Sequence, residues 1–300
     1  MINGIININK EKGYTSHDVV AKMRGILKTK KIGHTGTLDP DAEGVLPLCI
    51  GNATKLVNLI TDKDKTYEAV LKLGITTDTQ DITGKVLKTA DVHVLTDDIE
   101  KVINSYIGGY MQLPPMYSAI KVNGKKLYEL ARQGKEIERE RRSVIIHNIK
   151  ILEINEDDHE ISITVDCGKG TYIRTLINDI GEELGCGGTM KSLIRTAAGG
   201  FRIQNSYKLS DIEELVKTDQ LDKALQKTED ALSAYPKLVI DKEFEKLVHN
   251  GNPFLINHLV EPNQSPLDGM ARVYDGDNNF IGLYQFDIDK GRYYPVKMFL

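Results

Sequence analysis

The sequence has no tryptophan and only three cysteines among its 300 residues. Cys49, Cys167 and Cys186 are an odd number at wide spacing, and neither a CxxC pair nor paired histidines accompany them. This pattern indicates neither a disulfide framework nor a zinc site. We therefore expect structural thiols, the usual state of free cysteines, and no bound metal.

Long apolar runs are also missing. No apolar segment approaches the roughly 18 residues that a membrane-spanning helix needs. The first residues, MINGIININKEKG, lack the basic region and apolar stretch of a signal peptide. We therefore expect a cytoplasmic protein with no membrane contact. With 40% hydrophobic and 27% charged residues, the chain is long enough for a sizeable core and for two domains.

The net charge of −4 argues against a protein that coats nucleic acid indiscriminately. From Asp211 onward there are 10 Lys/Arg against 16 Asp/Glu, a net of −6, which leaves +2 for residues 1–210. Residues 121–142 hold eight basic and four acidic side chains, and an acid-free run contains Lys22, Arg24, Lys28, Lys30 and Lys31. Both stretches could contact phosphates, although solvated helix faces are the alternative.

Apolar periodicity predicts strands and helices without regular alternation, which favours a mixed α+β architecture over a parallel doubly wound one. A first strand at 5–8 precedes a helix that Thr15 and Asp18 would cap. Further strands are predicted at 67–73, after the turn at 83–85, at 143–154 and at 160–167, and helices near 96–106, 125–133 and 172–185.

After about residue 235 the chain changes to short segments broken by Gly, Pro and Asn. This texture predicts a small β-rich, barrel-like domain at 235–300. A helical stretch at 210–234 would join it to the first domain, residues 1–234.

The stretch KIGHTGTLDPDAEGVLP, residues 31–47, has too many glycines and prolines for a helix or a regular strand. Pro40 biases Asp39 toward an extended conformation, and the glycines permit tight turns. A rigid loop can hold one carboxylate in a fixed pose, as covalent catalysis requires. A turn in which Asp39 caps a backbone N–H is the alternative. Phosphate-loop motifs are absent from the sequence.

Two other side chains are candidates from their positions alone. Tyr67 begins a strand and could stack on a base, although a core tyrosine is the simpler interpretation. Arg174 opens a helix after two glycines, where its guanidinium could hold Asp39 ionised through a bidentate pair, unless it is a surface arginine. These residues indicate an α+β enzyme or an RNA-binding protein.

Taken together, four segments resemble the TruB family of tRNA pseudouridine-55 synthases. They are GHTGTLDPDAEGVLPLCIGNATK (33–55), KTYEAVLKLGITTDTQDITG (65–84), PPMYSAIKVNGKKLYELARQG (114–134) and CGKGTYIRTLINDIGEELG (167–185). The tail resembles, more weakly, the RNA-binding PUA domain of bacterial members. The resemblance implies a mainly antiparallel catalytic domain followed by a PUA-like domain.

The resemblance also implies roles for individual residues. Asp39 would be the nucleophile, Tyr67 the ring that stacks on the target base, and Arg174 the partner of Asp39. His34 would wedge into the T-loop of tRNA. The other substrate-binding positions carried over are Lys10, Asp78, Tyr172 and Leu193.

This chain departs from the family pattern at a few positions. Glu11 stands where the family usually has proline, Gly188-Thr189 replaces Ala-His, and Ile194 replaces the first arginine of Leu-Arg-Arg. Ile194 therefore supplies no basic contact at that position, which lies next to Leu193.

The implied reaction detaches a T-loop uracil of tRNA, turns it and rejoins it to the sugar through C5. It needs a flipped-out base and no cofactor. We expect tRNA as the partner, no obligate protein partner and a monomer. A tRNA-folding chaperone remains an alternative or additional function. A glycoside hydrolase is a third hypothesis, but Asp41 and Glu43 form no obvious second catalytic carboxylate with Asp39.

Overall fold

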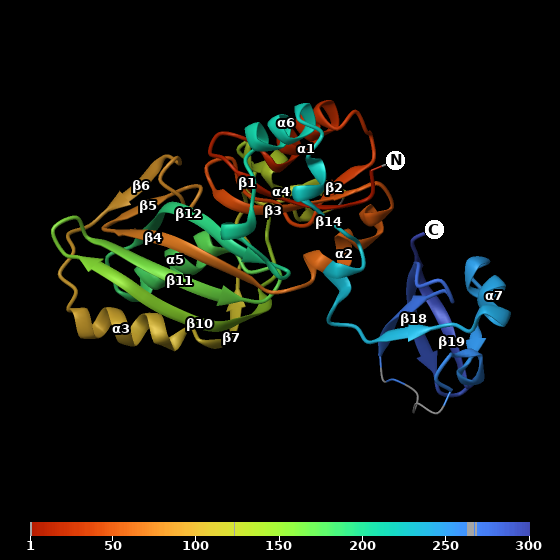
Figure 1. Ribbon diagram of the computed structural model, residues 1–300. Coiled ribbons are helices and arrows are strands. Elements are labelled where there is room, and N and C mark those ends of the chain that lie inside the picture. Colours follow the sequence, from red (N-terminus) through yellow and green to blue (C-terminus); the bar gives the residue numbers. More distant parts are fainter. Residues whose placement is uncertain (1, 123, 263–266, 268) are drawn as a thin grey trace.

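The computed structural model describes residues 2–122, 124–262, 267 and 269–300, and most of its described strands form two sheets (Figure 1). The larger sheet has the order β14-β1-β3-β12-β4-β11-β10-β7, with β2 and β13 paired at its side. Its strands are β1 (Gly4–Lys10), β2 (Ile32–His34), β3 (Glu43–Ile50), β4 (Lys65–Leu73), β7 (Gly108–Gln112), β10 (Arg142–Asn155), β11 (Glu160–Cys167), β12 (Gly188–Ala198), β13 (Phe201–Arg202) and β14 (Leu225–Gln226).

The pairings in this sheet are antiparallel except between β3 and β12. The mixed, mainly antiparallel α+β fold is therefore confirmed. Two small hairpins flank the sheet. They are formed by β5 (Ile75–Thr77) with β6 (Val86–Thr89), and by β8 (Lys121–Val122) with β9 (Lys125–Lys126).

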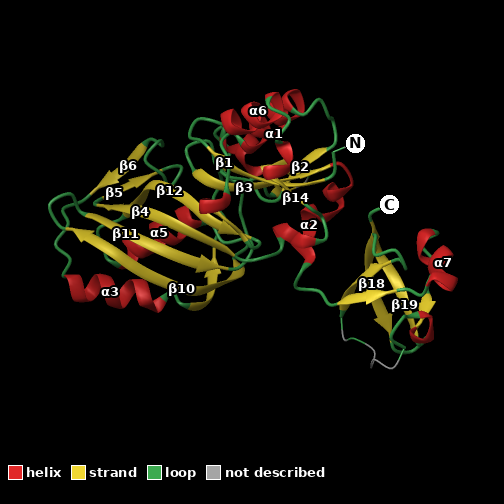
Figure 2. Cartoon of the chain, viewed as in Figure 1, coloured by secondary structure: helices red, strands yellow, loops and turns green. Residues whose placement is uncertain are grey.

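Helices cover the sheet in two groups. One group, α1 (Ser16–Ile26) and α6 (Leu209–Lys217), lies side by side over β1 and β3 and closes an apolar core (Figure 2). The other group, α3 (Thr96–Ser105) and α5 (Ile173–Glu183), packs on the half of the sheet that contains β4, β10 and β11. The predicted capping box of Thr15 and Asp18 is present at the start of α1. The shorter helical segments are α2 (Val57–Thr61), η1 (Gly51–Leu56), η2 (Ile203–Asn205), η3 (Leu221–Lys223) and η4 (Asp230–Leu232).

Two predicted helices are wrong in extent. The stretch 210–234 is not one linking helix, because α6 ends at Lys217 and Asp219 adopts a φ of 55°. Leu225 then pairs with Ile6 of the sheet edge, an interaction that a continuous helix would lose. The helix predicted at 125–133 is only α4 (Leu127–Ala131), because its first residues form β9.

The second sheet, of order β15-β17-β18-β19-β16, lies at the C-terminal end of the chain (Figure 1). Its elements are β15 (Lys237–Val239), η5 (Lys242–Phe244), α7 (Glu245–His249), β16 (Phe254–Leu255), η6 (Ile256–His258), β17 (Met270–Tyr274), β18 (Phe280–Asp287) and β19 (Arg292–Met298). It has its own apolar core. It also touches the first body, since Asn52 Nδ2 donates to the Phe299 carbonyl at 2.6 Å. No helix in the described ranges is long and apolar enough to cross a bilayer.

Candidate active site

Asp39 lies in the loop between β2 and β3. Gly44, at the start of β3, has a φ of 101°, and a Cβ there would lie 2.3 Å from the backbone oxygen of Arg195. Only glycine fits so close an approach. On the N-terminal side of Asp39, the Leu38 N–H donates to Ser16 Oγ at 2.9 Å. The loop is therefore fixed on both sides of Asp39, as the sequence predicts for a rigid catalytic loop.

Lys10 lies beneath this loop with a fully buried side chain. Its Nζ donates to the carbonyls of Pro40 at 3.0 Å, Ala42 at 2.6 Å and Glu11 at 3.1 Å. Burial lowers the pKa of Lys10 to about 8, against the opposing effect of nearby carboxylates. In this position Lys10 supports the turn that follows Asp39 and does not face an open cleft.

Arg174, in the first turn of α5, forms an ion pair with Asp39. Arg174 Nε lies 3.0 Å from Asp39 Oδ2, and the arginine side chain is only 5% exposed. The other guanidinium nitrogens donate to the carbonyls of Thr79 at 2.9 Å and Tyr117 at 2.8 Å. The predicted partnership is therefore present. It is not bidentate, because Asp39 pairs with Nε alone, while the other two nitrogens bond to these carbonyls.

The Asp39 carboxylate keeps 41% of its accessible surface, so a ligand can reach it. Desolvation by the surrounding protein nevertheless raises its pKa above the ordinary value, while the Arg174 guanidinium opposes this rise. Asp81 also raises the pKa of Asp39, and its Oδ2 lies 3.8 Å from Arg174. The site therefore places one accessible carboxylate beside one buried cation, in a setting that disfavours further negative charge.

Asp81 is a residue that sequence reasoning missed. Its Oδ1 accepts from Thr79 Oγ1 at 2.8 Å and from the Thr83 N–H at 3.0 Å, which fixes the β5–β6 connection against Arg174. Asp78, the acid chosen from the sequence, is exposed and accepts from the Lys85 N–H at 2.7 Å. Asp78 therefore stabilises the hairpin, and Asp81 approaches the ion pair. Only the spacing DTQD, which places a second acid three residues on, pointed to it.

Tyr67 lies on β4 and is only 8% exposed, packed among apolar residues that include Leu38 and Leu193. Its β12 partner is Arg195, which is also buried. Arg195 donates to the carbonyls of Val45 at 2.7 Å and Gly36 at 3.1 Å. Burial raises the pKa of Tyr67, and the Arg195 guanidinium opposes this effect. Arg195 thus supports the loop that carries Asp39, and Gly44 of this loop pairs with Lys10 on one side and with Arg195 on the other.

His34 and Tyr172 also border the loop. The His34 ring is half-buried and packs edge-on against the His17 ring, with the ring centroids 5.3 Å apart and the ring planes at 75°. Burial lowers the pKa of His34, which favours a neutral imidazole. Tyr172, at the N-cap of α5, is half-buried with a raised pKa. Asp41 and Glu43 are exposed and, among the described contacts, neither pairs with Arg174.

Comparison with known proteins identifies the family of this chain. A model of the TruB family pseudouridylate synthase N-terminal domain matches residues 24–173, and one of the tRNA pseudouridylate synthase B C-terminal domain matches residues 174–233. The chain belongs to the TruB family. A relative from Lachnoclostridium phytofermentans named tRNA pseudouridine synthase B is 55% identical, with full coverage of both chains. One of the same name from Alkaliphilus oremlandii is 47% identical over 94% of this chain and 92% of its own.

Solved structures agree with the TruB assignment. A chain of a Cbf5-Nop10-Gar1 complex superposes with a TM-score of 0.75 at 27% identity, over 99% of this chain and 85% of that one. A chain of an H/ACA RNP bound to a substrate RNA containing 2'-deoxyuridine gives 0.74 at 25% identity, with coverage of 99% and 85%. The expected family, fold and enzyme class are therefore confirmed, and the glycoside hydrolase hypothesis is dropped. The chain is an RNA-modifying pseudouridine synthase.

Proposed function

We propose that this TruB-family enzyme converts the T-loop uridine of tRNA to pseudouridine, with Asp39 as the group that reacts with the target nucleotide. Both relatives compared above are named tRNA pseudouridine synthase B. The observation that carries the residue assignment is the Asp39–Arg174 pair, in which an accessible carboxylate is held 3.0 Å from a buried guanidinium.

The reaction breaks the N1–C1′ bond of uridine and forms a C5–C1′ bond within the same nucleotide. The C5 proton is lost and N1 gains a proton, so atoms and charge balance without a redox step. An ionised Asp39 can stabilise or bond to the electron-poor intermediate, and Arg174 keeps the carboxylate oriented. Tyr67 and Leu193, packed behind the loop, would form the wall against which the uracil turns.

Base flipping costs a few kcal/mol, so contacts outside the pocket must supply it. His34 is suited to fill the vacated stack because a neutral, half-buried imidazole loses little solvation there. Tyr172 would contact the flipped nucleotide beside Arg174. The five basic side chains of the acid-free run from Lys22 to Lys31 are all exposed, which supports their assignment to backbone phosphates.

We infer a second RNA-contacting body in residues 235–300, the PUA-like domain. The core that its own strands form and the end of the family-model match at residue 233 support a boundary near 234, and Leu283 and Phe299 pack across this boundary against the first body. Exposed Lys290 and Arg292 stand at the turn into β19. Reversing both charges should weaken tRNA binding without changing the rate on bound tRNA. Unchanged affinity would contradict this assignment.

The proposed substrate can be tested with unmodified tRNA transcripts and no added cofactor. Chemical mapping of pseudouridine should show product at the T-loop uridine only. A matched transcript with cytidine at that position should give none. Product at other uridines of the matched transcript would refute the proposed specificity.

A further inference from the structure

Gln112, the last residue of edge strand β7, has a buried side chain that bonds twice to one residue. It is 1% exposed. Its Nε2 donates to the Tyr172 carbonyl at 3.0 Å, and its Oε1 accepts from the Tyr172 N–H at 2.7 Å. Tyr172 is the N-cap of α5, two residues before Arg174. The carboxamide therefore grips the backbone where the helix that carries the catalytic arginine begins.

A helix start is a weak point because its first N–H groups have no intrahelical partners, and in α5 no side chain of the N-cap residue supplies one. Two bonds from a planar amide, one to each peptide group that flanks the Tyr172 Cα, restrict both the position and the rotation of the backbone at Tyr172. To bind the Tyr172 carbonyl and N–H together, a side chain needs one donor and one acceptor side by side, which glutamine provides. An ionised glutamate would offer only acceptors and would face the Tyr172 carbonyl with a charge.

The segment that follows Gln112 holds the same helix start a second time. The Tyr117 carbonyl, beyond the Pro114-Pro115 pair, accepts from Arg174. On the same face of β7 as Gln112, Tyr110 donates from its hydroxyl to Asp179 further along α5. Residues 110–117 thus hold α5 in register from its N-cap onward.

We propose that Gln112 is a positioning residue for the reaction, which by holding the Tyr172 backbone sets Arg174 against Asp39. This inference rests on the proposed function, because the roles of Asp39 and Arg174 are part of it. Displacement of a catalytic group by about 1 Å from a remote change can cost on the order of 10²-fold in rate. Gln112 is 1% exposed and cannot contact RNA itself, and the groups that it holds act on the flipped nucleotide, so its effect falls on kcat.

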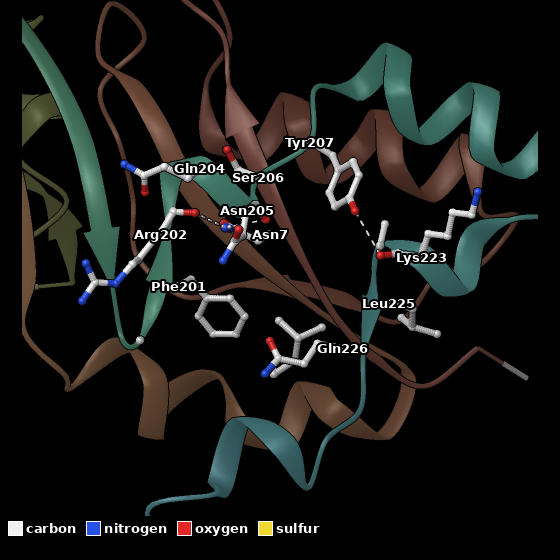
Figure 3. A pocket seen from close by; sticks show the side chains of 13 residues that line it. Asn7, Phe201, Arg202, Gln204, Asn205, Ser206, Tyr207, Lys223, Leu225 and Gln226 are labelled. Atoms are coloured by element: carbon white, nitrogen blue, oxygen red, sulfur yellow. Dashed lines mark hydrogen bonds between the residues drawn. The ribbon is translucent and has the colours of Figure 1, made fainter.

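The test compares Gln112→Met, which removes both hydrogen bonds at similar size, with a matched control, Asn7→Leu. Asn7 is also a buried amide, and its Nδ2 donates to the carbonyls of Arg202 at 2.9 Å and Asn205 at 3.2 Å. It lines a separate cavity of about 550 Å³ whose lining includes neither Asp39 nor Arg174 (Figure 3). Both variants lose stability, but only Gln112→Met should lose kcat, by about 10²-fold, with KM for tRNA unchanged.

Two further readouts separate positioning from general destabilisation. In Gln112→Met the amide hydrogen of Tyr172 should exchange faster, and in Asn7→Leu it should not. In Gln112→Glu, activity relative to wild type should rise as the pH is lowered, because a protonated carboxyl again offers one donor and one acceptor.

A kcat loss no larger than that of Asn7→Leu, a loss confined to KM, a pH-independent Gln112→Glu ratio, or unchanged exchange at Tyr172 would each overturn the proposal. Absence of product from wild type would refute the proposed function instead. In that case the exchange of the Tyr172 amide still decides whether Gln112 holds the helix start.

Discussion

Replacing Arg174 with lysine separates the positive charge near Asp39 from the geometry that places it. The guanidinium contacts Asp39 through Nε and the carbonyls of Thr79 and Tyr117 through its other nitrogens. A lysine has one nitrogen, which can satisfy one of these directions well. Two hydrogen bonds from a charged group are then lost, at about 1.5–3 kcal/mol each.

The total loss of about 3–6 kcal/mol is divided between two quantities. The free energy of unfolding falls because the Thr79 and Tyr117 carbonyls are contacted in the folded protein. The activation free energy rises because Asp39 takes part in the reaction. We expect the single-turnover rate of pseudouridine formation to fall on the order of 10²-fold. Arg202→Lys, at an exposed arginine, is the matched control and should retain the wild-type rate.

The pH profile gives a second readout of Arg174→Lys. Desolvation raises the pKa of Asp39 and Arg174 lowers it, so weakening the pair raises the pKa further. Because the reaction needs the ionised carboxylate, activity is lost as the pH falls through this pKa. The acid limb should therefore move to higher pH in the variant. A wild-type rate with an unmoved acid limb would refute the role given to Arg174.

Three other predictions follow from the supporting contacts. Lys10 has a pKa of about 8 in the folded protein, below its ordinary 10.5, so unfolding takes up a proton between these two pH values. The free energy of unfolding should therefore rise with pH in this range. In urea titrations at pH 8 and pH 10, Lys10→Met should lack that rise. Tyr67→Phe keeps the buried ring but loses the hydroxyl near Arg195, so product should form more slowly while tRNA affinity, measured by filter binding, stays the same; equal rates would exclude a role for the hydroxyl. The double variant Lys28→Glu/Lys30→Glu should weaken tRNA binding and reduce the slope of log affinity against log salt concentration by about one unit per lost phosphate contact. Lys101→Glu on α3 is the control and should change neither quantity. An unchanged slope in the double variant would exclude residues 22–31 from the RNA interface.

Local signals in the sequence were sufficient for much of the fold. The capping box of Thr15 and Asp18 acts within one turn, and the alternating pattern of residues 160–167 needs only one buried face, so both could be read directly. The predicted helix at 210–234 failed because an edge pairing of Leu225 with Ile6, far away in sequence, outweighs local helical propensity.

The site shows the same division. Asp39 and Arg174 could be proposed from the loop and from the motifs. That they pair through Nε alone could not be predicted, because this geometry depends on carbonyls from two other segments. Lys10 was assigned to the substrate, whereas the structure places it under the loop, a distinction that sequence spacing does not carry. Asp81 was missed because its approach to Arg174 is a tertiary contact.

The most direct test of the account is the single-turnover rate of pseudouridine formation for Asp39→Asn beside Asp41→Asn, with tRNA affinity measured for both. Asp41 is an exposed carboxylate two residues away in the same loop, so it controls for loss of a charge. We predict that Asp39→Asn binds tRNA but forms no product, and that Asp41→Asn retains the wild-type rate. Product formation by Asp39→Asn at the wild-type rate would contradict the assignment of Asp39 as the reacting carboxylate.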